Sequence, residues 1–193
     1  MYSTTDAIVL SLQPHSDKAH ILHAYTRAFG RVNYYLYGLG RKHPVGLYAP
    51  LSLIRITASC PPNGVPTVKE ATRLTFDSAS ALSSNFYKQA IALFLSEVLF
   101  HVLRHPMPDE PMFDFIEQAV RLLDETDEPQ NFHLSFLIGL ASKLGFAMEQ
   151  TPLPPCTRTE RQKQLRELCA YFAEHVETWR KPKSLDILTE VFD

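Results

Sequence analysis

The chain contains few cysteines and no long apolar stretch. Its 193 residues include only Cys60, Cys156 and Cys169, which cannot all pair with one another and whose spacing matches no zinc-binding pattern. No run approaches the roughly 20 apolar residues that a membrane-spanning helix needs. The first residues also lack the basic segment and apolar core of a signal peptide. We therefore expect a cytoplasmic protein in a reducing compartment.

Catalytic motifs are also lacking. The sequence has no phosphate-binding loop, no Gly-x-Ser-x-Gly turn and no Cys/His dyad. Glu97, His101 and His105 recur every four residues, a spacing that can present metal ligands on one helix face. Their segment is apolar nearly all round and offers no fourth ligand, so structural histidines are favoured. The sequence predicts no enzyme, metal or cofactor, and a small-molecule enzyme is the most distant alternative.

The chain has little net charge, but its charges are unevenly distributed. The total is −2, which argues against a strong polyanion binder. Residues 1–80, however, carry eight Lys and Arg against four Asp and Glu, whereas residues 81–130 carry three against nine. Residues 131–193 are balanced, with eight of each sign. A basic first part and an acidic middle part predict two modules with different electrostatic roles.

The periodicity of apolar residues changes along the chain from that of strands to that of helices. Short strand-like runs occupy residues 7–12, 21–26, 31–37, 51–57 and 65–74. Five such strands without intervening helices favour a small antiparallel barrel or sandwich, which leaves no exposed edge. Helical periodicity follows at residues 85–105, 110–124, 131–144, 160–179 and 184–192, with Asp109 as a cap and Gly145 at a helix end. The predicted fold class is α+β, with domains 1–80 and 81–193 and a short connector at 147–159.

The predicted hairpin of residues 21–37 carries the candidate binding residues. Gly30 can adopt the positive φ of a tight turn. Beyond this turn Val32, Tyr34 and Leu36 share one face, and Asn33, Tyr35 and Tyr37 share the other; the pattern leaves open which face is exposed. Aromatic faces beside flexible cations suit nucleic acid, whereas the alternative is an ordinary hairpin with a solvated rim. The candidate nucleic-acid contacts are Arg27, Arg31, Tyr35, Tyr37, Arg41 and Lys42, extended by Lys69 and Arg73.

Several short motifs, taken in order, resemble the RecO family of recombination mediators. The N-terminal motifs are Asp6-Ala7-Ile8-Val9-Leu10, Ser16-Asp17-Lys18, Tyr25-Thr26-Arg27 with Gly30-Arg31, and Gly38 followed by Arg41-Lys42. The later motifs are Asn131-Phe132-His133-Leu134-Ser135-Phe136-Leu137, Leu144-Gly145-Phe146 and Lys183-Ser184-Leu185-Asp186-Ile187-Leu188. Each motif is short, but their shared order is specific and spans nearly the whole chain.

This resemblance implies an N-terminal oligonucleotide-binding (OB-fold) barrel followed by an all-helical domain. It implies a nucleoid-associated bacterial protein that binds single- and double-stranded DNA and anneals complementary strands. The implied partners are RecR, the single-stranded DNA-binding protein (SSB) and, indirectly, the recombinase RecA. Such a mediator needs no catalytic residue.

The chain departs from the family pattern at two points. Some relatives bind zinc through four cysteines in a segment after the Leu-Gly-Phe motif, whereas the short connector here holds only Cys156, so we expect no zinc finger. Relatives also hold the acidic tail of SSB with arginines of the helical domain, whereas residues 131–144 offer only Lys143. Other candidate cations for that tail are Lys88, Arg104 and Arg121.

The sequence thus supports two main hypotheses. The first is a DNA repair and recombination mediator whose barrel binds DNA. The second is a protein-interaction module whose small barrel binds no nucleic acid and whose helices recruit a partner; the weak net charge sustains it. A steep salt dependence of DNA binding would separate them.

Overall fold

The computed structural model describes residues 1–74, 84–148, 154 and 157–191. Contacts divide the chain into two compact units. The barrel unit comprises Met1–Ser80 and Leu103–Val120, and the helical unit comprises Ala81–Val102 and Arg121–Asp193. Segment 103–120 therefore packs with the barrel although it is mostly helical, and the domain boundary expected at residue 80 stays a prediction.

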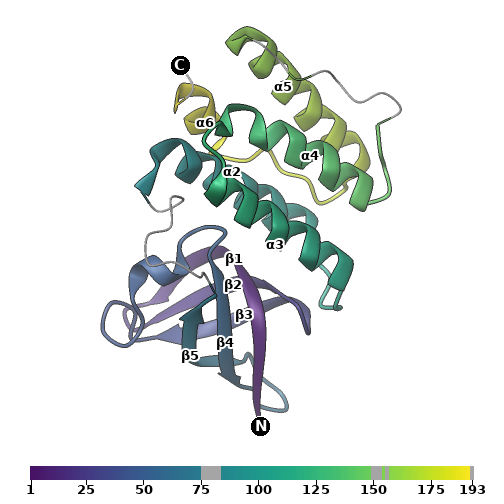
Figure 1. The fold of residues 1–193 in the computed structure, drawn as a ribbon. Helices are drawn as coiled ribbons and strands as arrows, with labels where there is room; N and C mark the ends of the chain where they lie inside the picture. Colours follow the sequence, from purple (N-terminus) through teal and green to yellow (C-terminus); the bar gives the residue numbers. More distant parts are fainter. Residues whose placement is uncertain (75–83, 149–153, 155–156, 192–193) are drawn as a thin grey trace. The chain divides into compact units, whose positions relative to one another are not determined.

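Five strands form the closed barrel (Figure 1). The order around it is β1-β2-β3-β5-β4, with β1 also paired to β4. All pairs are antiparallel except β3 and β5, which are parallel and meet where Tyr35 lies opposite Thr67. The parallel pair arises because β5 runs antiparallel to β4 along one edge and meets β3 along the other, which closes the barrel. The strands are β1 (Tyr2–Ser16), β2 (Ala19–Thr26), β3 (Gly30–Tyr37), β4 (Leu53–Ser59) and β5 (Thr67–Arg73).

The five-strand barrel and the α+β class are confirmed, and the largest departure from the expected strands is β1. It runs for 15 residues, well beyond the apolar run at 7–12, because polar residues on both sides also pair in register. Its pairing with β2 shifts between Val9 and Ser11 and again between Pro14 and Ser16. Such β-bulges bend a strand and re-aim side chains.

Alternating side chains of the strands fill the barrel. Leu22 and Ala24 of β2 face inward opposite Tyr34 and Val32 of β3, as the two-residue period requires. The short 3₁₀ helix η1 (Val45–Tyr48) adds two more buried residues to this core. The buried core residues are Ala7, Val9, Leu22, Ala24, Tyr34, Leu36, Leu47, Tyr48, Ile54, Ile56, Ala58 and Val68.

The β2–β3 turn lies directly against the segment that precedes helix α3 (Glu110–Glu125). Gly30 has a φ of +63°, as predicted, and a Cβ there would lie 2.2 Å from the carbonyl oxygen of Met107. The backbone N–H of Arg31 donates to the carbonyl of His105 at 3.1 Å. Only a residue without a side chain fits this approach. As expected, Asp109 caps α3: its Oδ1 accepts from the N–H of Met112 at 3.0 Å.

The helical unit is built around a buried helix, as the sequence predicted. Ile91, Phe94 and Val98 of α2 are fully buried. Thr157 and Glu160 form a reciprocal capping box at the start of α5, and Gly145 has a φ of +90° just after α4. The helices are α2 (Phe86–Val102), α4 (Phe132–Lys143), α5 (Arg158–His175) and α6 (Leu185–Val191), with the 3₁₀ turn η2 (Pro129–Asn131) before α4.

The Glu97, His101 and His105 series is not continuous. Helix α2 ends at Val102, so His105 is not on it. Pro106 disfavours helical conformation at the residue before it, which is His105. Glu97 instead accepts hydrogen bonds from the backbone N–H and the Oγ of Ser184, at 2.8 and 2.6 Å. Within the described ranges, no three His, Cys, Asp or Glu side chains are grouped so as to hold a metal ion. Among the described helices, none has the length and apolarity to cross a membrane.

Candidate nucleic-acid interface

The structure decides which tyrosines of the hairpin face outward. Tyr34 and Leu36 are buried in the barrel, whereas Tyr35 and Tyr37 lie on its outer surface, and Tyr37 is 48% exposed. The ring centroids of Tyr35 and Tyr37 are 6.1 Å apart, and the ring of His15 lies 5.4 Å from that of Tyr35. We call these three side chains the ring cluster. His15 was not predicted, because it lies at the β-bulge, where the strand period fails.

The ring cluster belongs to a larger face without acidic residues. Register places the outward residues of β1, β2 and β3 in rows, in which Gln13, Ile21 and Tyr35 are neighbours, as are Ser11, His23 and Asn33. Nδ1 of His23 lies 2.6 Å from Oδ1 of Asn33. No Asp or Glu is among these described strand residues, so an approaching polyanion meets no repulsion from them. We call this surface the hairpin face: Ser11, Gln13, His15, Ile21, His23, Asn33, Tyr35 and Tyr37.

A compact loop presents two predicted cations next to Tyr37. The backbone N–H groups of Arg41 and Lys42 both donate to the carbonyl of Gly38, at 3.1 and 2.8 Å. His43 anchors the loop, because its ring hydrogen-bonds to the buried Tyr48 hydroxyl at 2.8 Å. Burial, with a smaller effect of the Lys42 charge, lowers the pKa of His43. Arg41 and Lys42 are therefore held on an ordered turn and are themselves exposed.

Two further cations lie at the same end of the hairpin. Lys18 is exposed in the β1–β2 turn, next to Ala19, which pairs with Tyr37. Lys69 is exposed on β5, at the shift of register where Val68 pairs with Ala58 and Glu70 with Thr57. Lys69 was predicted and Lys18 was not, although Lys18 stands in the Ser-Asp-Lys motif. Arg73, at the far end of β5, is exposed and donates from Nη2 to the carbonyl of Gly46 at 2.8 Å.

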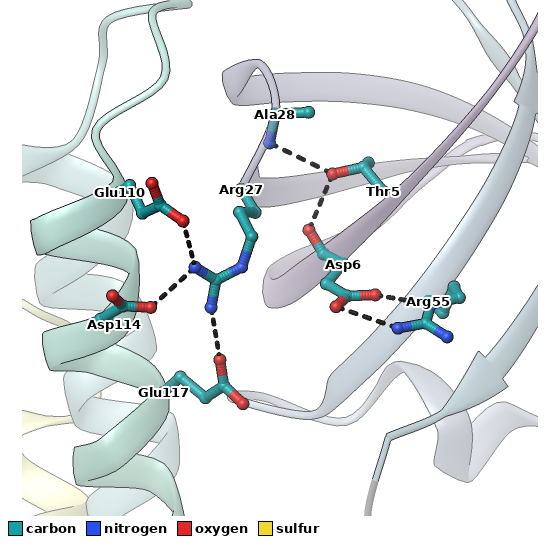
Figure 2. Close-up of polar contacts among 8 residues, drawn as sticks. All are labelled: Thr5, Asp6, Arg27, Ala28, Arg55, Glu110, Asp114 and Glu117. Carbon is teal, nitrogen blue, oxygen red and sulfur yellow. Dashed lines mark hydrogen bonds and ion pairs between the residues drawn. The ribbon is translucent and has the colours of Figure 1, made fainter.

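Arg27, at the opposite end of the hairpin, is held by three carboxylates of α3 (Figure 2). Its Nη1 lies 3.2 Å from Glu110 and 2.7 Å from Asp114, and its Nη2 lies 2.8 Å from Glu117. The guanidinium also lies over the ring of Phe113, 4.4 Å from the centroid. Burial lowers the pKa of Arg27, but hydrogen bonds and charge from Asp114 and Glu117 outweigh it and raise the pKa. The side chain is 31% exposed.

Neighbouring residues hold the same turn in place. Figure 2 shows the backbone N–H of Ala28 donating to Oγ1 of Thr5, at 3.2 Å, and the two-pronged contact of Arg55 with Asp6, at 2.7 and 3.1 Å. Arg31, the second predicted cation here, donates from Nη1 to the carbonyl of Leu103 at 3.2 Å. Burial, helped by the nearby charge of Arg104, lowers the pKa of Arg31 to about 10. At neutral pH Arg31 is therefore still a cation, but one engaged with segment 103–107.

Seven of the eight predicted DNA contacts thus fall into two groups, and Arg73 lies apart at the far end of β5. Six residue steps separate Arg31 from Tyr37, which corresponds to about 20 Å along a strand. Tyr35, Tyr37, Arg41, Lys42 and Lys69 gather at the open end of the hairpin, whereas Arg27 and Arg31 lie at the turn. Of these two groups, the open end offers the exposed cations, whereas Arg27 and Arg31 are half-buried.

The cations proposed for the SSB tail are scattered. Lys88 is only 4% exposed, and its Nζ donates to the carbonyl of Asp124 at 2.7 Å. Lys143 is exposed in the last turn of α4, Arg121 is half-buried in α3, and Arg104 belongs to the barrel unit. A cavity of about 660 Å³ lies along α5 and α6, and none of these four residues lines it. Its lining includes Leu165, Trp179 and Leu185 together with Arg166 and Lys181.

Comparison with known proteins shows the family to which the chain is similar. The family model described as Recombination protein O N terminal matches residues 1–75, and that described as Recombination protein O C terminal matches residues 83–162. The chain is 27% identical to the DNA repair protein RecO of Christiangramia forsetii, covering 97% of this chain and 98% of the relative. It is 28% identical to that of Flavobacterium johnsoniae, with full coverage of both, and 35% identical to that of Phocaeicola vulgatus over 75% of this chain and 61% of the relative.

The alignments also show a difference in length. The match to the Flavobacterium johnsoniae protein extends over 239 positions, whereas this chain has 193 residues. The relative therefore has residues to which nothing corresponds here. Cys156, the one cysteine of the connector, lies outside the described residues.

Proposed function

The chain belongs to the RecO family of DNA repair and recombination proteins, and from this premise we propose that its barrel binds single- and double-stranded DNA through the hairpin face and the cations beside it. Bound in this way, the protein anneals complementary strands and, together with RecR, helps to load RecA onto SSB-coated DNA. We place this activity in the bacterial cytoplasm, at the nucleoid.

The observation that supports this proposal is the combination of rings on the hairpin face, which has no Asp or Glu, with four exposed cations beside it that outnumber the two exposed carboxylates there, Asp17 and Glu70. Arg41, Lys42, Lys18 and Lys69 are exposed around the open end of the hairpin, and Tyr35 and Tyr37 lie between them. Each phosphate that a cation neutralises releases counterions, which gives affinity without sequence preference. OB-fold barrels commonly bind oligonucleotides on the face of strands 2 and 3, where the hairpin face lies.

Annealing follows from the same electrostatics and needs no catalytic group. Two DNA strands repel each other through their phosphates, and cations held on a folded surface lower that repulsion when both strands are bound. RecO proteins are mediators that are generally non-catalytic, and the chain offers exposed cations for this role. The proposed mechanism therefore depends on how many phosphates the open end neutralises.

We assign protein contacts to the helical unit. RecR is one proposed partner. For the acidic SSB tail, Lys143 and Arg121 of the helical unit remain candidate contacts, as does Arg104 of the barrel unit, and Lys88 is the weakest because its amine is already engaged. The cavity along α5 and α6 is lined by Arg166 and Lys181 but also by Asp186 and Glu190, and Lys181 pairs with Asp186 at 3.6 Å, so its charge does not favour an acidic peptide.

The test is titration of a fluorescent single strand at several salt concentrations. We expect binding that weakens steeply with salt, and the double variant Arg41→Ala/Lys42→Ala should reduce the slope of log K against log salt by about 1.4, at about 0.7 per phosphate contact. A control that removes one exposed cation from the helical unit, Lys163→Ala, should leave the slope unchanged. Absence of binding by the wild type at low salt would refute the proposal and favour a protein-interaction module.

A further inference from the structure

We infer that the ring cluster of His15, Tyr35 and Tyr37 holds unstacked bases, and that it sets the preference of the protein for single-stranded over duplex DNA. This inference rests on the proposed function. It divides the surface into two parts: the cations bind the phosphates of any DNA, and the rings contact only bases that are free of a partner strand.

The geometry of the rings leaves their faces available. The planes of Tyr35 and Tyr37 are inclined by 37° with centroids 6.1 Å apart, and His15 is inclined by 51° to Tyr35 at 5.4 Å. Neither pair is stacked in parallel, so no ring face is fully covered by its neighbour in the cluster. Bases in a duplex are only about 3.4 Å apart along each strand. Because the tyrosine centroids are nearly twice as far apart, two successive bases can meet these rings only after their own stack has opened.

The rings are held in place before any ligand arrives. Tyr35 and Tyr37 are two residues apart on β3 and therefore point to the same side. The backbone N–H of Tyr35 donates to the carbonyl of Pro66 at 2.8 Å, which fixes this residue where β3 meets β5. The β-bulge in β1 places His15 next to Tyr35. Aromatic side chains on paired strands lose little entropy on binding, so base stacking contributes nearly its full free energy.

The charges around the cluster specify the ligand. An apolar peptide would need an apolar groove, but the hairpin face is mostly polar and aromatic. Four exposed cations border it, against the two exposed carboxylates of Asp17 and Glu70: Lys18, Lys69, Arg41 and Lys42. A duplex meets these cations with its phosphates while its bases stay stacked inside, out of reach of the rings. A single strand meets both the cations and the rings. The predicted consequence is a selectivity that depends on the rings and an affinity for all DNA that depends on the cations.

The experiment compares three fluorescent ligands of about 20 nucleotides: an oligothymidylate, a duplex, and an abasic strand that keeps its phosphates but lacks bases. The variant Tyr35→Ala/Tyr37→Ala should lose about 10-fold affinity per ring for oligothymidylate, about 100-fold in total. Its affinity for the duplex and for the abasic strand should change less than about twofold. His15→Ala should cause a smaller loss, about threefold, for oligothymidylate alone.

Two controls keep the result interpretable. Tyr35→Phe/Tyr37→Phe retains the rings and should retain the selectivity, which separates stacking from loss of the hydroxyl groups or of folding. Tyr2→Ala removes another exposed tyrosine of the same barrel, in the part of β1 that pairs with Ser59 of β4, and should change nothing. If the wild type binds DNA but Tyr35→Ala/Tyr37→Ala loses affinity equally for all three ligands, or for none of them, the ring assignment is overturned while DNA binding stays intact. A wild type that binds none of the ligands would overturn the proposed function itself.

Discussion

The two ends of the β2–β3 hairpin carry similar residues and have different surroundings. At the turn, Arg27 and Arg31 are held by α3 and by segment 103–107. At the open end, Arg41 and Lys42 are exposed on a loop whose backbone is ordered by its own hydrogen bonds. A cation near a hairpin is thus a structural residue or a candidate ligand contact according to what the rest of the chain brings beside it.

Electrostatics explains the difference in expected role. Arg27 faces three carboxylates, so the charge around it is already negative, and a phosphate would have to displace them. Residues 81–130 are the acidic part of the chain, and α3 supplies the carboxylates from there. The acidic segment therefore neutralises one end of a basic module and leaves the other end available.

The largest expected difference between the two ends is the loss of stability when a glycine at each end is replaced by alanine. Gly30→Ala should destabilise the protein by about 3–5 kcal/mol, since it adds left-handed backbone strain to a clash with Met107. Gly40→Ala, at the open end, has a similar positive φ but nothing within 4 Å of the added Cβ, so about 1–2 kcal/mol is expected. Urea unfolding monitored by circular dichroism measures both. Equal losses would show that segment 103–107 does not pack closely on the turn.

A smaller effect on stability should follow from removing one cation at each end of the hairpin in turn. Arg27→Ala should reduce stability by about 1–2 kcal/mol, because partly exposed ion pairs and one cation–π contact are lost. It should leave the salt slope of DNA binding unchanged. Arg41→Ala should do the reverse, with stability within about 0.5 kcal/mol of the wild type. If Arg27→Ala flattened the salt slope instead, the turn end would also contact DNA.

The smallest effect concerns His23, which lies between the two ends. Burial lowers its pKa below 6.5, the hydrogen bond with Asn33 opposes this, and the charge of Arg31 adds to it. The unfolded chain therefore takes up a proton more readily than the folded one, so stability should decrease as the pH falls from 7 through 6.5. His23→Gln should weaken this dependence, measured as the urea midpoint at pH 7 and pH 5. An unchanged pH profile would mean that His23 titrates alike in both states.

Much of the barrel was predictable because its signals are local. Alternation located the hairpin, Gly30 marked the turn, and the switch to helical periodicity separated strands from helices. The capping role of Asp109 and the glycine after α4 also follow from residue types alone. Predictions failed where a local rule was broken: the helix with His101 stops before His105, and the β-bulge at His15 has no periodic signature.

By itself, the sequence determined the α+β class, the five strands, the order of the helices and the set of cations from which a DNA surface can be built. Only the tertiary structure decided which tyrosines face outward and which arginines are occupied. The reason is physical: the period of a strand fixes which side chains share a face, but burial of that face depends on the barrel closing around it. Likewise, the carboxylates that hold Arg27 are more than 80 residues away in the chain, and only folding places them within 3.2 Å.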